Sequence, residues 1–212
     1  MDEKTTQNDR ILSYAMEIQS IAQCGLAYCK DPYDRERYMR LREISAEMVS
    51  ERLSISAVRI RDVFLGESGY QTPKVDTRAA VFDECGRILL AHEKNGTWSL
   101  PGGWCDVDQS VFSNTEKEVA EETGLSVKAK CLIAVQDWRR HNVMNYLFGV
   151  VKTFVLCQPL SGAFAENIET TEARYFAMDE LPEKLAVEKT TRAQIEMCFT
   201  AYADPNWQVQ CD

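Results

Sequence analysis

The chain has 212 residues, of which 45% are hydrophobic, and a formal net charge of −9. This length suits one large domain or one domain with a smaller companion, and the apolar fraction supports a sizeable core. The acidic charge argues against a broad surface for nucleic-acid phosphates, because such surfaces are basic. No apolar run reaches the roughly 18 residues of a membrane span, and the N-terminus MDEKTTQNDR is unlike a signal peptide. We therefore expect a cytoplasmic protein without membrane or nucleic-acid partners.

The eight cysteines include no C-x-x-C pair. In a chain without a secretion signal, we expect them to act as small, partly buried apolar residues rather than as a zinc site. Cys105 is not expected to be a nucleophile, because Asp106 and Asp108 would raise the pKa of its thiol.

Three amphipathic helices are predicted at the N-terminus. Apolar residues keep helical spacing over residues 8–30, and Asp31-Pro32 then starts a second helix, with Asp as N-cap and Pro in the first turn. A third helix starts near Ser54. Such a small bundle is marginal alone, so we expect residues 1–70 to form a helical domain that packs on another structure. The stripes expected to face its core are Ile11, Ala15, Ile18, Ala22 and Leu26; Tyr38, Leu41, Ile44 and Met48; and Ile55, Val58, Val63 and Phe64.

A glycine- and proline-containing linker at residues 66–73 separates these helices from a second pattern, in which strands precede and follow a central helix. This order predicts an α/β fold over residues 73–205, specifically an α/β/α sandwich on a mixed sheet. The predicted strands are 75–82, with 86–92 as its hairpin partner, then 125–136, 146–157 and 173–177. Thr190 or Thr191 caps a last helix through Ile195, Cys198 and Phe199.

Residues 102–125, GGWCDVDQSVFSNTEKEVAEETGL, read as a glycine turn, a polar loop and a helix. Glu118, Glu121 and Glu122 share one face of that helix because they are three and four residues apart. These carboxylates repel one another in the last turn, where the helix dipole also disfavours anions, so a bound divalent cation would stabilise them. A solvated acidic helix end is the alternative interpretation. The other expected features are a cap at Asp108 or Ser110, a stop at Gly124, and a core-facing stripe of Phe112, Thr115 and Val119.

This stretch resembles the Nudix box, G-x5-E-x7-R-E-U-x-E-E-x-G-U, in which U is a bulky aliphatic residue. Gly103 aligns with the first glycine, whereas Gln109 replaces the isolated glutamate and Lys117 replaces the arginine. Lysine keeps the charge but lacks the planar fork. Residues 21–38 and 185–195 are similar to a Nudix subgroup of CDP-choline or ADP-ribose pyrophosphatases with a helical extension. The matching box positions are Glu118, Val119, Glu121, Glu122, Gly124 and Leu125.

The resemblance implies a pyrophosphatase that uses Mg²⁺, with Mn²⁺ as the alternative, to cleave a small nucleotide conjugate between its two phosphates. CDP-choline ranks slightly ahead of ADP-ribose on the N-terminal similarity. The implied metal ligands are the Gly103 carbonyl, Glu118, Glu121 and Glu122, with Lys117 counted among the catalytic residues. The implied substrate contacts are Arg78, Gly102 and Gly103, and the residues eligible as general base are Glu121, Glu166, Glu169 and Glu172.

Several alternatives stay open. Arg78 fits an exposed strand position equally well, and Asp137 and His141 are weaker candidates in a polar loop. Trp98 is expected in the core, whereas Trp104 either stacks on a base or fills the core. The chain could also be a non-hydrolytic Nudix-fold binding module, or its N-terminal helices a unit for binding another macromolecule. Because the three glutamates are intact, we favour an enzyme. Positive and negative residues alternate along the second helix, so we expect the N-terminal helices to form a homo-oligomer or to complete the substrate site.

Overall fold

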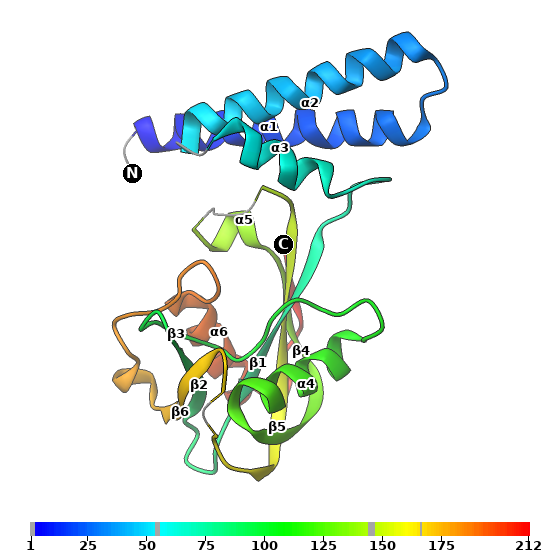
Figure 1. The fold of residues 1–212 in the computed structure, drawn as a ribbon. Coiled ribbons are helices and arrows are strands. Elements are labelled where there is room, and N and C mark those ends of the chain that lie inside the picture. The colour runs from blue at the N-terminus through cyan, green and yellow to red at the C-terminus, as the bar shows by residue number, and fades with distance from the viewer. Residues whose placement is uncertain (1–2, 54–55, 144–146, 166) are drawn as a thin grey trace. The chain divides into compact units, whose positions relative to one another are not determined.

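The structure is a computed structural model of the chain (Figure 1) and describes residues 3–53, 56–143, 147–165 and 167–212. The chain divides into two compact units, Met1–Thr72 and Pro73–Asp212. Within the described residues, no helix combines the length and apolar character needed to cross a membrane.

In its described residues, the first unit consists of three helices, α1 (Glu3–Tyr28), α2 (Pro32–Leu53) and α3 (Ala57–Leu65). α2 starts as predicted, because the Asp31 carboxylate accepts hydrogen bonds from two N–H groups of its first turn. α3 is capped by Ser56, whose hydroxyl accepts a hydrogen bond from the Arg59 N–H. The start predicted near Ser54, and the side chain of Ile55, lie outside the described residues.

Small residues mediate the contact between α1 and α2. Ala15, Ala22 and Ser45 are fully buried, and the Ser45 hydroxyl donates a hydrogen bond of 2.6 Å to the Ala15 carbonyl oxygen. In α3, Ile60 and Phe64 occupy the buried face. The predicted core stripes are therefore only partly correct, because small side chains let the helices approach closely and leave larger ones outside. The wrongly placed residues are Ile11, Val58 and Val63, which are 36%, 63% and 47% exposed.

The described part of the second unit contains two sheets. The four-stranded sheet has the order β1 (Lys74–Val81), β5 (Val150–Gly162), β4 (Leu125–Asp137) and β7 (Gln210–Cys211). It is mixed, as predicted, because β1 and β7 lie parallel to their neighbours while β4 and β5 are antiparallel. The smaller, antiparallel sheet has the order β3 (Trp98–Ser99), β2 (Ile88–Glu93) and β6 (Thr170–Phe176). The short elements β3, β7, α5 (Trp138–His141) and the 3₁₀ helix Met178–Glu180 were not predicted from the sequence.

Helices α4 (Val111–Thr123) and α6 (Arg192–Ala203) cover opposite faces of β1. Ala79 belongs to an apolar cluster with Val119 of α4, whereas Ala80 belongs to a cluster with Ile195 of α6. Successive side chains of a strand point to opposite faces, so β1 is buried on both sides. The result is the predicted α/β/α sandwich, and Figure 1 shows the two helices on either side of the strands. α6 starts after Thr191, one of the two predicted caps.

The predicted hairpin between β1 and residues 86–92 is wrong. A single bridge between Phe82 and Ile88 joins the two segments, both of which the structure describes in full, and β2 pairs with β6 instead. The reason is that β1 pairs with β5 along one edge, while the loop at residues 101–105 runs along its other edge.

Two smaller predictions also need correction. β5 begins at Val150 and continues to Gly162 rather than spanning residues 146–157, of which residue 146 lies outside the described part. Phe112 is 38% exposed, whereas Thr115 and Val119 are buried as expected. Phe112 lies in the first turn of α4, next to Val111, which packs against the core cluster around Val119.

Candidate active site

The glycine turn lies tightly along β1. The Thr77 N–H donates a hydrogen bond of 2.8 Å to the Gly103 carbonyl oxygen. Gly102 has a φ of 144°, and a Cβ added there would lie 1.9 Å from the Thr77 carbonyl oxygen. A Cβ added at Gly103 would lie 2.6 Å from a carboxylate oxygen of Glu118. Gly102 therefore needs glycine, because a side chain would meet the backbone of β1, whereas a side chain at Gly103 would displace the Glu118 carboxylate.

Local signals fix both ends of α4. Ser110, one of the two predicted caps, forms a reciprocal capping box with Ser113. Gly124 ends the helix in the left-handed conformation, with a φ of 72°, as predicted. The helix thus presents its last two turns, which carry the glutamates, next to the glycine turn.

Asn114 ties these parts together, and the sequence analysis did not single it out. It is fully buried, and its amide nitrogen donates to the Thr77 hydroxyl at 2.9 Å and to the Trp104 carbonyl at 3.2 Å. Its amide oxygen accepts from the Asp106 N–H at 3.0 Å. An asparagine in the interior of a helix is intrinsically unfavourable, and this was the available signal for a structural role.

Lys117 lies among the carboxylates. Its ammonium is 2.9 Å from a Glu121 oxygen, 3.2 Å from an Asp106 oxygen and 3.3 Å from a Glu118 oxygen. Hydrogen bonds to Glu121 and Asp106 raise the pKa of Lys117, so the ammonium stays charged. The lysine therefore offsets the repulsion within the cluster.

Glu122 is directed to the glycine turn, where its carboxylate accepts a 2.9 Å hydrogen bond from the Gly102 N–H. Burial raises the pKa of Glu122 to about 7, and burial also raises the pKa of Glu118. Among the described residues, no three Asp, Glu, His or Cys side chains are already gathered as metal ligands. The existing contacts explain this, since Lys117 holds two of the glutamates and the turn holds the third.

A cavity of about 560 Å³ lies over this helix face. It brings together the predicted site residues Arg78, Gly102, Gly103, Lys117, Glu118, Glu121 and Glu122. The remaining lining residues are Asp76, Trp104, Asp106, Asn167, Ile168, Glu169 and Lys189. One wall is acidic, and a second part of the lining, Arg78 with Lys189, is cationic.

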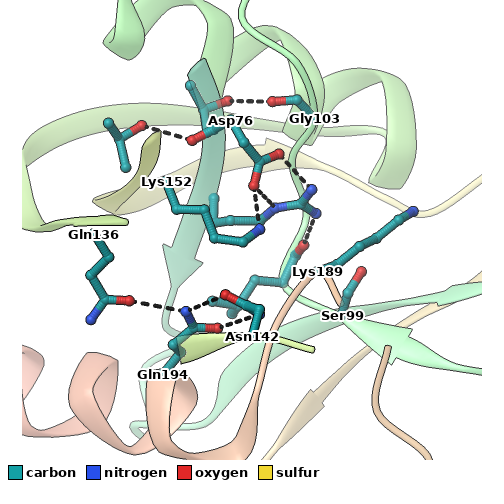
Figure 2. Close-up of polar contacts among 12 residues, drawn as sticks. Asp76, Ser99, Gly103, Gln136, Asn142, Lys152, Lys189 and Gln194 are labelled. Atoms are coloured by element: carbon teal, nitrogen blue, oxygen red, sulfur yellow. Dashed lines mark hydrogen bonds and ion pairs between the residues drawn. The ribbon is translucent and has the colours of Figure 1, made fainter. Parts of the chain in front are cut away.

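Arg78 is only 3% exposed, so the exposed strand position is ruled out. Its guanidinium donates to both carboxylate oxygens of Asp76, at 3.0 and 2.7 Å, and to the Leu100 carbonyl at 3.2 Å. Lys152, 1% exposed, reaches the same carboxylate at 2.5 Å (Figure 2). Burial alone would raise the pKa of Asp76, but the two cations outweigh it and lower that pKa. The pKa of Lys152 is lowered to about 8, mainly by burial and secondly by the positive charge of Arg78.

The other sequence candidates divide between the cavity and the rest of the unit. Glu169 and Trp104 line the cavity, and Trp104 is 40% exposed. Glu172 lies on β6 beside Arg174, outside the lining, and Glu166 lies outside the described residues. The candidates that the structure places elsewhere are Trp98, in the core as expected, His141, paired with Asp212, and Asp137, paired with Arg139.

Asn167 and Lys189 are among the cavity residues that sequence reasoning missed. Asn167 donates from its amide nitrogen to the carbonyl oxygens of Glu121 and Glu122, at 3.1 and 3.0 Å, and so satisfies the C-terminal end of α4. Lys189 approaches the cavity from the segment before α6, where Glu93 holds its ammonium at 2.8 Å. Both belong to loops far from the box in sequence, so no local pattern indicates them.

Comparison with known proteins agrees with this geometry. Residues 72–196 match the family model of the NUDIX domain, and residues 9–64 match a model described as "UDP-X-like, N-terminal oligomerisation domain". A Bacillus subtilis (strain 168) protein named "Putative ADP-ribose pyrophosphatase YjhB" is 40% identical over 92% of this chain and 93% of its own length.

Two solved structures are similar as well. The crystal structure of an ADP-ribose pyrophosphatase from Streptococcus suis 89-1591 has 46% identity and a TM-score of 0.62, over 66% of this chain and all of the other. The crystal structure of a UDP-X diphosphatase has 32% identity and a TM-score of 0.62, over 96% of this chain and 98% of the other. Family model, relatives and box geometry agree, and the chain therefore belongs to the Nudix hydrolases, with the N-terminal helical domain of their UDP-X-like members.

Proposed function

We propose that this Nudix hydrolase cleaves a nucleoside diphosphate linked to a second group and releases a nucleoside monophosphate and a phosphorylated second product. The observation that carries the proposal is one cavity that joins three glutamates on α4 to the cations Arg78 and Lys189. A diphosphate needs positive charge on its oxygens, and hydrolysis needs a carboxylate that can take a proton from water. This cavity offers both.

Nudix hydrolases generally use divalent metal ions, and we propose Mg²⁺, with Mn²⁺ as the alternative. The carboxylates of Glu118, Glu121 and Glu122 suit a hard cation. Burial disfavours the charged forms of Glu118 and Glu122, and a bound ion would offset that cost. The Gly103 carbonyl already accepts hydrogen bonds from the Thr77 N–H at 2.8 Å and from the Thr77 hydroxyl at 3.4 Å, so an ion bound there would replace the longer of the two. When bound, the ion supplies Lewis acidity toward the phosphate oxygens.

The chain's own residues have distinct tasks in this proposal. Arg78 holds a phosphate oxygen from a fixed position, because Asp76 and the Leu100 carbonyl orient its guanidinium. Glu121 and Glu169 both line the cavity and remain eligible to accept the proton of the attacking water. Lys117 keeps the acidic face assembled.

For the substrate, we propose ADP-ribose ahead of CDP-choline. The N-terminal similarity alone favours CDP-choline slightly, but the relatives that align over most of their length carry the names ADP-ribose pyrophosphatase and UDP-X diphosphatase. The test is hydrolysis of ADP-ribose, CDP-choline and a UDP-sugar with Mg²⁺, with the products separated by chromatography. AMP and ribose 5-phosphate are expected from ADP-ribose. Release of ADP would refute the cleavage site, and faster hydrolysis of a nucleoside triphosphate would refute the substrate class.

We also propose that the chain forms a homo-oligomer through α1. Four large apolar side chains lie along one stripe of this helix, and the matching family model describes the domain as an oligomerisation domain. They are Ile11, Tyr14, Ile21 and Tyr28, with exposed fractions of 36%, 57%, 54% and 69%. Light scattering should show that Tyr14→Arg combined with Ile21→Arg lowers the mass to that of one chain. Glu51→Arg on α2 is the control, and an unchanged mass in the double variant would refute the stripe as the interface.

A further inference from the structure

A row of buried polar side chains crosses the four-stranded sheet. Lys152 on β5 pairs in register with Asp76 on β1 and with Gln136 on β4. Directly paired residues of neighbouring strands project from the same face of a sheet, and these three are 3%, 1% and 6% exposed in the order Asp76, Lys152 and Gln136. Asp76 lines the cavity and Lys152 does not. Lys152 therefore lies behind the cavity wall.

Lys152 acts on Arg78 through one carboxylate. The Asp76 oxygen that accepts from the Lys152 ammonium at 2.5 Å also accepts from Arg78 Nε at 3.0 Å. The second Asp76 oxygen accepts from Arg78 Nη2 at 2.7 Å. Figure 2 shows Lys152 extending to the Asp76 carboxylate. The orientation of the Arg78 fork thus depends on a carboxylate that Lys152 holds from behind.

The charges of this cluster do not cancel. Arg78 alone already neutralises Asp76, so the buried Lys152 leaves the three side chains with one excess positive charge. Taking an ammonium out of water is costly even when it is paired, and an apolar residue of similar size would fit a protein interior at lower cost. The excess charge is useful where an anion reaches the same place, and the cavity wall formed by Asp76 and Arg78 is that place.

We propose that Lys152 is a positioning residue for the diphosphate of the substrate: it fixes Asp76, which orients Arg78, and it leaves this wall of the cavity positively charged. The identity of the anion rests on the proposed function. Lys152 itself touches neither the substrate nor the reacting atoms.

The test uses Lys152→Met, which removes the charge, keeps a side chain of similar length and leaves the pair of Asp76 and Arg78 intact. The probe is inorganic pyrophosphate, titrated into the full chain with Mg²⁺ present and followed by calorimetry. We expect the Kd to rise at least about tenfold in this variant. With ADP-ribose, KM should rise by a similar factor while kcat changes less than about threefold, because the lost interaction serves binding.

Two further variants separate positioning from a merely structural role. Lys152→Arg keeps the charge and should bind pyrophosphate within about threefold of the wild type. Lys128→Met removes an exposed lysine, whose side chain is 61% exposed beside Glu116, and should change nothing. If Lys152→Met does not melt cooperatively, the test rests on Lys152→Arg. A loss of more than about tenfold in the pyrophosphate affinity of Lys152→Arg then overturns the proposal.

A folded Lys152→Met that binds pyrophosphate within about threefold of the wild type also overturns it, as does a fall in kcat with unchanged KM and Kd. If the wild type does not hydrolyse ADP-ribose, the proposed function fails while the pyrophosphate titration still tests Lys152.

Discussion

Glu122→Gln tests whether burial of a carboxylate in the wall of the cavity destabilises the fold. Burial raises the pKa of Glu122 from 4.5 to about 7. One pKa unit corresponds to about 1.4 kcal/mol, so the ionised carboxylate destabilises the folded unit by about 3 kcal/mol. Glutamine keeps an oxygen for the Gly102 N–H, which is 2.9 Å away, but carries no charge. The variant should therefore be more stable than the wild type and less active.

The pH dependence of this difference follows from the sign of the shift. Because the folded pKa lies above the unfolded one, the stabilisation by Glu122 is complete below pH 4.5 and is lost as the pH rises through about 7. Glutamine does not titrate. The melting temperature of the variant should thus match that of the wild type near pH 4.5 and exceed it by about 5–10 °C at about pH 8.

The assay is thermal unfolding of both proteins in a chelating buffer across this pH range. Glu196→Gln, at an exposed position paired with Arg192, is the control and should show no such trend. With Mg²⁺, turnover of Glu122→Gln should fall at least about tenfold. A variant that melts below the wild type at about pH 8, or a difference that does not change with pH, would contradict the reasoning.

Three other substitutions test the turn, the helix and the lysine. Gly102→Ala should lower the melting temperature by at least about 5 °C, because its Cβ would lie 1.9 Å from a backbone oxygen, whereas Gly66→Ala, with nothing closer than 3.5 Å, is the control. Asn114→Ala should lower the free energy of unfolding by about 1–3 kcal/mol in urea denaturation, since it leaves buried partners unpaired, and an unchanged midpoint would refute its tying role. Lys117→Met should lower kcat at least about tenfold while Lys117→Arg stays within about threefold, and equal effects of both would show that its charge is not what matters.

Local signals in the sequence determined most of α4 and its chemistry. The cap at Ser110, the stop at Gly124 and the spacing of the glutamates each depend on residues within a few positions of one another. The same holds for the start of α2 at Asp31-Pro32 and for Thr191 before α6. Such features are readable because a helix satisfies its own backbone and repeats every 3.6 residues. They were sufficient to indicate the family and the acidic face of the cavity.

The cationic side of the cavity was decided only by the tertiary structure. An alternation of buried and exposed side chains along β1 would allow Arg78 to be exposed. Both faces of that strand are covered, however, so the two-residue repeat of a strand does not indicate which side chains are buried. Lys152 and Lys189 reach the same region from segments about 75 and 110 residues away, and no local pattern predicts which strands become neighbours. The wrong hairpin has the same origin, because strand pairing is chosen by the packing of the whole sheet. The sequence therefore indicated which residue types form the site, whereas long-range packing determined their burial, their partners and their charge balance.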